Sequence, residues 1–258
     1  MPVRGIARFV GAGLLDLFRE VGGMTILFGR VLRALFPPTL DTHELVRNLH
    51  KMGNRSVPIV VLTGLFTGGI MVIQSGIFVK KWGATSLVGW GAGYAVFREV
   101  GPILIGLMFS GRVGANNTAE LGTMTVTEQL DGLRALAIDP IRFLIVPRVL
   151  AMIVTLFCLT VIGDLVAIVG AVIVAIPMLG VSPWTFYWSM LEHLHTEDFT
   201  NGLFKALTFG FAIALTSCHF GISVKGGAVG VGRAVNDAVV AAAVSIFLLD
   251  FFLTFLLQ

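Results

Sequence analysis

Residues 94–111 read YAVFREVGPILIGLMFSG, an apolar stretch of membrane-spanning length that contains two adjacent charged residues, Arg98 and Glu99. Lys205 and Asp250 lie in two further apolar stretches of the chain. A charge at the centre of the hydrocarbon layer costs about 2.5–3.5 kcal/mol on insertion scales, and less near the interface. Such residues usually face a cavity, a partner or a transport route, so they are the first candidates for a functional site.

The composition is that of an integral membrane protein. Of the 258 residues, 56% are hydrophobic and 13% are charged, whereas an average soluble domain has about 25% charged residues. A spanning helix needs roughly 20 mostly apolar residues. Five stretches meet this requirement: residues 57–79, 94–116, 143–176, 202–222 and 235–257. We therefore predict an all-α membrane domain over residues 41–258, with Pro177 ending the third span.

Lysine and arginine are distributed unevenly between the two sides of these spans. If the segment before residue 57 is cytoplasmic, the outer loops hold only Lys80 and Lys81. The cytoplasmic segments and span ends then hold Arg4, Arg8, Arg19, Arg30, Arg33, Arg47, Lys51, Arg55, Arg112, Arg134, Arg142, Arg148, Lys225 and Arg233. This bias matches the positive-inside rule, so we predict a cytoplasmic N-terminus and an outward-facing C-terminus. It also accounts for the net charge of +3 without a nucleic-acid partner.

Residues 14–36 are apolar but carry charges at helical spacing. At 100° per residue the charged positions fall within an arc of about 140°, and they are Asp16, Arg19, Glu20, Arg30 and Arg33. The opposite side is apolar and consists of Leu14, Leu17, Val21, Met24, Phe28, Leu32 and Leu35. Such a helix is expected to lie in the membrane surface, and Pro37-Pro38 would end it, so residues 1–40 are predicted to form an interfacial segment. The alternative is a sixth span that buries five charges.

The segment between the second and third spans, residues 120–140, reads ELGTMTVTEQLDGLRALAIDP. Polar residues at one end are followed by leucines at helical spacing, and Asp139-Pro140 ends the pattern. We predict a short amphipathic helix on the cytoplasmic side. The pattern fits either an ordinary interfacial connector or a helix that contacts a soluble partner.

Gly64 and Gly68 in the first span are four residues apart, and Gly111 and Ala115 repeat this spacing in the second. Pairs of small residues at this spacing let helix backbones approach closely. The pairs could serve packing within one chain or packing between two copies, and the pattern alone leaves both open.

Motifs for nucleotide chemistry and catalysis are missing from the sequence. The chain has no Gly-x-x-x-x-Gly-Lys-Ser/Thr phosphate loop and no complete Gly-x-Gly-x-x-Gly motif. Its histidines are scattered, and Cys158 and Cys218 lie within spans, so neither a metal site nor a disulfide is expected. We therefore predict a chain without catalytic residues or a cofactor of its own, which would need an ATP-hydrolysing partner for uphill transport.

Three stretches resemble one family of membrane proteins. They are residues 97–148 (FREVGPILIGLMFSGRVGANNTAELGTMTVTEQLDGLRALAIDPIRFLIVPR), 230–240 (GVGRAVNDAVV) and 249–257 (LDFFLTFLL). These stretches are similar to the MlaE/YrbE family of permeases, the membrane subunits of ABC transporters that work with MCE-domain proteins. The likeness covers nearly the whole chain from about residue 40.

The resemblance implies a homodimer in the bacterial inner membrane, in which each copy has an interfacial elbow helix followed by five spans. ATPase subunits that bind ATP and Mg²⁺ would dock on the cytoplasmic face. A hexameric ring of MCE domains would sit on the periplasmic face, the side on which the C-terminus is expected. The complex would move phospholipids between the inner membrane and the outer envelope.

The resemblance also implies roles for individual residues. The segment 120–140 would contain a coupling helix against the ATPase, with contacts from Glu128, Gln129, Asp131 and Leu133. The end of the first span would border an outward-facing lipid pocket at the dimer axis through Phe78, Val79 and Trp82. The basic pair Lys80 and Lys81, together with Arg98, could favour anionic headgroups at the rim of that pocket.

The charged residues inside the spans lie at a similar predicted level. With a rise of 1.5 Å per residue, Glu99 is roughly 8 Å, Lys205 roughly 5 Å and Asp250 roughly 10 Å from the outer surface. We predict that Arg98, Glu99, Lys205 and Asp250 form one polar cluster. This cluster would either gate the lipid pocket or serve as a purely structural ion-pair network.

Two other functions fit parts of the pattern. An ion-driven secondary transporter of a hydrophobic substrate could use the intramembrane carboxylates as proton carriers, but such proteins are typically built from repeats with broken helices near the midplane. The sequence has no convincing internal repeat, and the carboxylates considered above are off-centre. A scaffold without transport activity would leave the charges in the spans unexplained.

Overall fold

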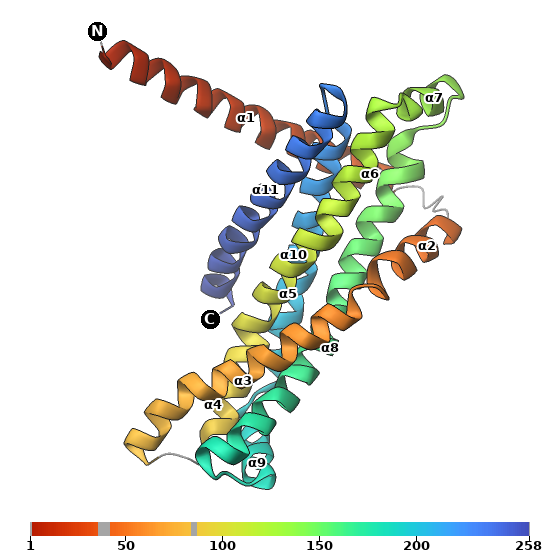
Figure 1. Ribbon diagram of the computed structural model, residues 1–258. Helices are drawn as coiled ribbons and strands as arrows, with labels where there is room; N and C mark the ends of the chain where they lie inside the picture. Colours follow the sequence, from red (N-terminus) through yellow and green to blue (C-terminus); the bar gives the residue numbers. More distant parts are fainter. Residues whose placement is uncertain (1, 36–41, 84–86, 258) are drawn as a thin grey trace.

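The computed structural model describes residues 2–35, 42–83 and 87–257 (Figure 1). Side chains are described throughout these ranges except at residues 2–14, 16, 17, 78 and 80. The α-helices are α1 (Pro2–Ala34), α2 (Thr42–Gly53), α3 (Val57–Trp82), α4 (Val88–Ala95), α5 (Gly101–Phe109), α6 (Ala115–Val126), α7 (Gln129–Ala135), α8 (Val146–Leu179), α9 (Pro183–His193), α10 (Thr196–Ile222) and α11 (Gly227–Leu256). Three π-helical turns interrupt them: η2 (Val96–Val100), η3 (Ser110–Gly114) and η4 (Ile141–Ile145).

Five helices of the described part are long and apolar enough to cross a membrane. They are Val57–Ile77, Val88–Val126, Ile141–Leu179, Thr196–Ile222 and Gly227–Leu256. Each coincides with one predicted span, so the prediction of an all-α, five-span membrane protein is confirmed. The helices run in alternating directions and form a bundle whose two ends we name by the short helices there, the α7 end and the α9 end (Figure 1).

Several predicted span boundaries were wrong: the fourth span begins at Thr196 and the fifth at Gly227, not at residues 202 and 235. The second span begins at Val88 and continues through α6, so it includes the first residues of the segment 120–140. The third span does not stop at Pro177, which lies inside α8, but ends at Gly180, whose φ is +67°. A proline near the end of a helix removes one backbone hydrogen bond, whereas a glycine in the left-handed conformation turns the chain out of the helix.

Glycines bring α3 and α8 into backbone contact. A Cβ atom on Gly64 would lie 2.6 Å from the carbonyl oxygen of Gly163, and one on Gly68 would lie 1.7 Å from that of Ala167. No other residue type leaves space for such an approach. The small-residue pair of the first span therefore serves packing within the chain, which decides between the two alternatives for Gly64 and Gly68.

Helices α6 and α10 are joined by hydroxyl groups as well as by apolar packing. Thr118 Oγ1 lies 3.1 Å from the carbonyl oxygen of Ser217, and Thr125 Oγ1 lies 3.1 Å from that of Gly221. Both threonines also lie within hydrogen-bond distance of the preceding turn of their own helix. Hydroxyl-to-backbone contacts of this kind connect helices where no water is present to satisfy polar groups.

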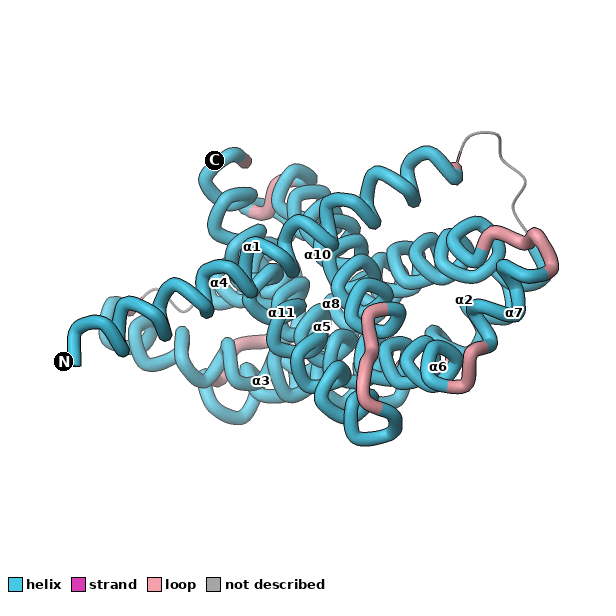
Figure 2. Tube along the Cα trace, turned by 90° about the horizontal axis from the view of Figure 1, so that it is seen from above, coloured by secondary structure: helices cyan, strands magenta, loops and turns pink. Residues whose placement is uncertain are grey.

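Helix α1 crosses the α7 end of the bundle at a steep angle to the spans (Figures 1 and 2). Leu27 and Val31 are buried against the bundle, and Glu20 lies 2.8 Å from Nε2 of His219 on α10. Leu27 and Glu20 fall within the charged arc expected to face headgroups, so this arc is not uniformly exposed. The helix starts before the predicted residue 14 and ends before Leu35; Pro37-Pro38, Asp16, Leu14 and Leu17 lie outside the described residues or side chains.

The connection between the second and third spans contains one short helix, α7. Glu128 and Ala137 have φ values of +58° and +60°, and they bound the helix on either side. Leu130 is buried, whereas Leu136 and Ile138 are exposed. The predicted helix is thus present but shorter than the leucine spacing indicated, because the left-handed residue Ala137 breaks the register before Ile138.

Candidate functional site

The second span departs from a regular α-helix at the point where it carries Arg98 and Glu99. Residues Val96–Val100 form the π-helical turn η2, and Pro102 follows at the start of α5. Proline has no N–H group to donate to the carbonyl of residue 98. A single π turn accommodates such an interruption, and turns of this kind are frequent at functional sites.

A glycine contact places the fourth span directly against this turn. A Cβ atom on Gly202 would lie 1.9 Å from the carbonyl oxygen of Phe97. Lys205 follows Gly202 by three residues, so it lies on the same face of α10. The local sequence therefore brings the Lys205 side chain to the level of Glu99.

Lys205 is the centre of a buried polar cluster. Its side chain is 1% exposed, and Nζ lies 2.6 Å from Oε2 of Glu99 and 3.0 Å from Oδ1 of Asp250. The same Nζ lies 2.7 Å from Oγ1 of Thr254, which is one helical turn beyond Asp250 on α11. We call Glu99, Lys205, Asp250 and Thr254 the Lys205 cluster.

The charges of the Lys205 cluster do not cancel. It contains two carboxylates and one ammonium group, and removing such charges from water costs several kcal/mol per ion unless they are paired. Thr254 Oγ1 lies 3.3 Å from both carboxylate oxygens of Glu99 and gives that group a further partner. The Glu99 side chain is 30% exposed, so it is the member of the cluster that a molecule at the surface can reach.

Arg98 does not belong to this cluster, and the prediction of a single four-residue cluster was wrong. Its NH1 lies 2.9 Å from Oδ1 of Asp198, its NH2 donates to the carbonyl oxygen of Leu257 at 3.1 Å, and the guanidinium lies over the Tyr94 ring. Successive residues of a helix point about 100° apart. Arg98 and Glu99 therefore reach different neighbours.

The predicted lipid-pocket residues lie on the last turns of α3, toward the α9 end. Val79 is half-buried and packs against a separate apolar cluster that includes Val72, Val88 and Phe186. Trp82 and Lys81 are exposed. The side chains of Phe78 and Lys80 lie outside the described part of the chain.

The predicted coupling residues lie at the opposite end of the molecule. Glu128, Gln129 and Asp131 are exposed, and Asp131 pairs with Arg134 at 2.7 Å. Leu133 is half-buried and packs against the main core. The backbone of α7 thus presents three polar side chains outward and one apolar side chain inward.

Two functional candidates were missed in the sequence. Asp198 holds Arg98 and also accepts from the backbone N–H of His195, which caps α10. Asp164, in the middle of α8, is 1% exposed, and neither of its oxygens has a hydrogen-bond partner among the described residues. A charge within an apolar stretch, the signal that identified Lys205, also marks Asp164, and applying it to the third span would have found this residue.

The described residues contain no group of three or more His, Cys, Asp and Glu side chains that could hold a metal ion. Cys158 and Cys218 are free thiols. The charged groups of the Lys205 cluster form ion pairs between helices, although Asp250 Oδ1 accepts no hydrogen bond from a described residue.

Comparison with known proteins identifies the family. A family model described as Permease MlaE matches residues 45–256. The chain belongs to the MlaE permease family. The match begins within α2 and extends to the last residue of α11, so it includes all five spans and the Lys205 cluster.

Relatives of this MlaE-family chain come from bacteria and from a plant. It is 36% identical over 249 residues to a probable ABC transporter permease protein of Rickettsia conorii, covering 96% of each chain. It is 31% identical over 250 residues to the intermembrane phospholipid transport system permease protein MlaE of Haemophilus influenzae, covering 95% of this chain and 94% of the relative. It is 33% identical over 232 residues to the chloroplastic protein TRIGALACTOSYLDIACYLGLYCEROL 1 of Arabidopsis thaliana, covering 89% of this chain and 65% of the relative.

The names of the two bacterial relatives describe permeases. The MlaE-family chain is accordingly a multi-pass membrane permease, as its five apolar helices and the family match both indicate.

Proposed function

We propose that this chain is the membrane subunit of an ABC transporter that moves phospholipids between the bacterial inner membrane and the outer envelope. The proposal is supported by the names of its relatives, which include ABC transporter permeases and a phospholipid transport permease. The observation that carries it is the Lys205 cluster, whose ion pairs join three spans of an MlaE-family bundle. Among its charged side chains, Glu99 is the one that is appreciably exposed. Breaking these contacts would let the spans separate for a lipid.

We propose that the α7 end faces the cytoplasm and the α9 end faces the periplasm. Exposed basic residues support this orientation at the α7 end, where Arg134, Arg142 and Lys225 lie. Exposed acidic residues, Glu192 and Glu197, lie at the α9 end. Positively charged segments favour the cytoplasmic side, so the N-terminus is cytoplasmic and the C-terminus periplasmic.

In this orientation α7 is the coupling helix. Glu128, Gln129 and Asp131 would contact a cytoplasmic ATPase, which binds ATP and Mg²⁺, while Leu133 anchors α7 to the bundle. This chain needs no cofactor of its own. Helix α1 would serve as the elbow helix in the cytoplasmic surface of the membrane, because it crosses the bundle and leaves Phe18, Ile26 and Leu32 exposed.

The periplasmic end would hold the lipid pocket. Two copies of the chain would enclose it with the last turns of α3, so that Phe78, Val79 and Trp82 border it and Lys80 and Lys81 lie at its rim. The proposal is supported by apolar faces on α3 and α11 that remain exposed in one copy: Leu62, Phe66, Ile77, Phe247, Phe251 and Phe255. A hexameric MCE-domain ring would exchange lipid with the permease at this end.

Purification of the native complex through a tag on this chain tests the proposal. We expect an ATPase subunit and an MCE-domain protein to co-purify, phospholipid to be found by mass spectrometry, and ATP hydrolysis to increase when phospholipid is added. Recovery of the chain with no ATPase and no lipid would contradict it.

Asp164 favours a second candidate, an ion-driven secondary transporter. A buried carboxyl with no partner among the described residues is a group that could carry a proton across the middle of the membrane. Proteoliposomes that contain this chain without an ATPase would then move substrate when a pH gradient is imposed. An absolute requirement for ATP excludes this candidate.

A further inference from the structure

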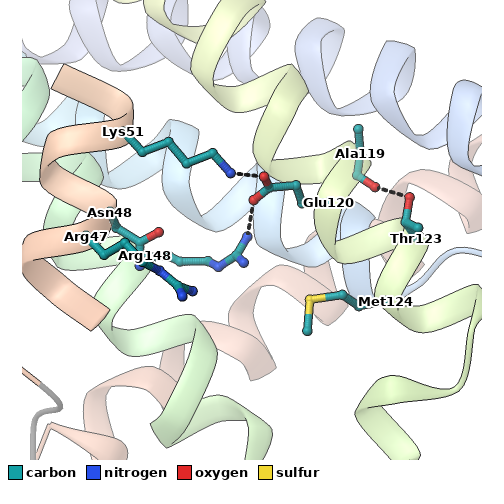
Figure 3. A pocket seen from close by; sticks show the side chains of 8 residues that line it. All are labelled: Arg47, Asn48, Lys51, Ala119, Glu120, Thr123, Met124 and Arg148. Carbon is teal, nitrogen blue, oxygen red and sulfur yellow. Dashed lines mark hydrogen bonds and ion pairs between the residues drawn. The ribbon is translucent and has the colours of Figure 1, made fainter. Parts of the chain in front are cut away.

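A cavity of about 580 Å³ with charged side chains in its lining lies between α2, α6 and α8 (Figure 3). It is lined by Arg47, Asn48, Lys51, Ala119, Glu120, Thr123, Met124 and Arg148. A smaller cavity of about 180 Å³ adjoins it, shares Lys51 and Glu120, and is also lined by Arg55 and Arg112. None of these residues has a role in the lipid pocket or the coupling helix proposed above.

Positive charge exceeds negative charge in this cavity. Figure 3 shows the side chains of Lys51 and Arg148 both directed at Glu120, the one acidic side chain of the lining. Arg148 NH1 lies 3.2 Å from Oε2 of Glu120, and Lys51 forms an ion pair with Oε1 of the same group. One carboxylate therefore serves two cations. Arg47 pairs with Glu44, a residue outside the lining.

The neighbouring cations extend this surplus. Arg55 and Arg112 of the adjoining cavity form no ion pair with any residue that the structure describes. Burial and the nearby charges of Arg148, Arg47 and Arg55 lower the pKa of Lys51, although Glu120 is in contact with it. An additional anion in the cavity would relieve this repulsion.

The cavity is held in shape by buried groups. Arg148 is 5% exposed, and its NH1 also donates to Oδ1 of Asn117 at 2.9 Å. Asn117 in turn donates to Oγ of Ser217 at 2.9 Å, which ties the arginine to α10. An arginine fixed in this way is preorganised for an anion, since little rotamer freedom is lost when the anion binds.

We propose that this cavity binds a phosphate group. A phosphate offers several strong acceptor oxygens and one or two negative charges. It can therefore supply the fixed guanidinium and the lysine with more acceptors and more negative charge than the single carboxylate that they share. The volume exceeds that of a phosphate ion and leaves space for the glycerol of a phospholipid headgroup. In the proposed orientation the cavity lies where headgroups of the cytoplasmic leaflet are found, but phosphate binding itself does not depend on the proposed transport function.

Binding measurements on the purified native complex test this proposal. Phosphatidic acid, diacylglycerol and inorganic phosphate are added separately, and bound lipid is counted by native mass spectrometry while the midpoint of thermal unfolding is recorded. We expect phosphatidic acid to bind and stabilise the complex and diacylglycerol, which lacks the phosphate, to do neither. Lys51→Gln and Arg47→Gln should each weaken phosphatidic acid binding by about tenfold, because each removes a charge-assisted contact.

Lys225→Gln is the matched control, because Lys225 is an exposed lysine at the same end of the bundle but outside this cavity. It should leave the affinity within about twofold, since an exposed charge at a distance is screened by salt. If inorganic phosphate binds with the same dependence on Lys51 while phosphatidic acid does not, the phosphate comes from solution rather than from a lipid.

Three results would overturn the proposal. One is phosphate binding that Lys51→Gln leaves unchanged. Another is an equal loss with Lys225→Gln, which would indicate general attraction to a basic surface. The third is loss of the ATPase subunit from the Lys51→Gln complex with phosphate binding intact, which would identify an acidic partner segment as the occupant.

Discussion

Gly202 lies so close to the carbonyl oxygen of Phe97 that a side chain cannot fit between α10 and the turn η2, since a Cβ atom would approach that oxygen to 1.9 Å. The contact sets the distance between the second and fourth spans at the level of the Lys205 cluster. It therefore determines whether Lys205 can reach Glu99.

Replacing Gly202 by alanine should push the two helices apart. We expect the variant to lose about 1–3 kcal/mol of stability, the usual cost of overpacking, and to transfer lipid more slowly because the Lys205–Glu99 pair lengthens. Thermal unfolding and a lipid-transfer assay measure the two effects. Gly91→Ala is the control, since a Cβ atom there meets nothing within 4 Å; equal behaviour of the two variants would contradict the prediction.

Removing the ammonium group of Lys205 should destabilise the protein more than any change at an exposed lysine. Lys205→Met leaves Glu99 and Asp250 without their shared cation, and breaking a buried pair in this way costs about 3–5 kcal/mol. Lys81→Met, at an exposed position, should cost less than about 0.5 kcal/mol.

Reversing the charges of Lys205 and Asp250 tests whether their ion pair, rather than either side chain alone, is needed for lipid transfer. Lys205→Asp and Asp250→Lys should each abolish lipid transfer, and the double variant should recover part of it because the pair is restored in the opposite sense. A double variant as inactive as the single ones would show that pairing is not what the cluster contributes.

Arg98 should act on the ends of two helices rather than on the Lys205 cluster. Arg98→Gln removes the contacts with Asp198 and with the carbonyl oxygen of Leu257, so the start of α10 and the end of α11 should exchange backbone hydrogens faster. Hydrogen–deuterium exchange measures this directly. Arg134→Gln, which breaks the exposed pair with Asp131, is expected to change stability by at most about 1 kcal/mol.

Asp164 should be replaceable by asparagine with a gain in stability. Neither carboxyl oxygen has a partner among the described residues, and an unpaired charge inside the membrane costs about 2.5–3.5 kcal/mol. Asparagine has nearly the same shape and no charge, so we expect a higher midpoint of thermal unfolding with lipid transfer retained. A stable variant that transfers no lipid would instead assign Asp164 a part in transport.

The sequence predicted the spans well because apolar length is a property of each segment alone. It predicted Lys205, Glu99 and Asp250 at one level for the same reason, since depth follows from the position in each span. It failed for Arg98 because the direction of a side chain depends on the π turn before Pro102 and on which neighbouring helix it meets. Neither is encoded in hydropathy.

Other features needed tertiary information. The role of Gly64 and Gly68 was undecided until α8 was seen against them. The cavity at Glu120 joins residues from three helices that are far apart in the chain, and no local motif brings Lys51 and Arg148 to one carboxylate. The length of α7 depends on two left-handed residues, Glu128 and Ala137, which are uncommon choices for that conformation.

The hydroxyl contacts of Thr118 and Thr125 with α10 have a mechanical consequence. These two helices can slide or part only if both contacts between them break, so α6 and α10 should move together as one unit. A displacement of α7 at one end of these two helices would then be transmitted to Lys205, near the other end of α10, with little bending of the helices.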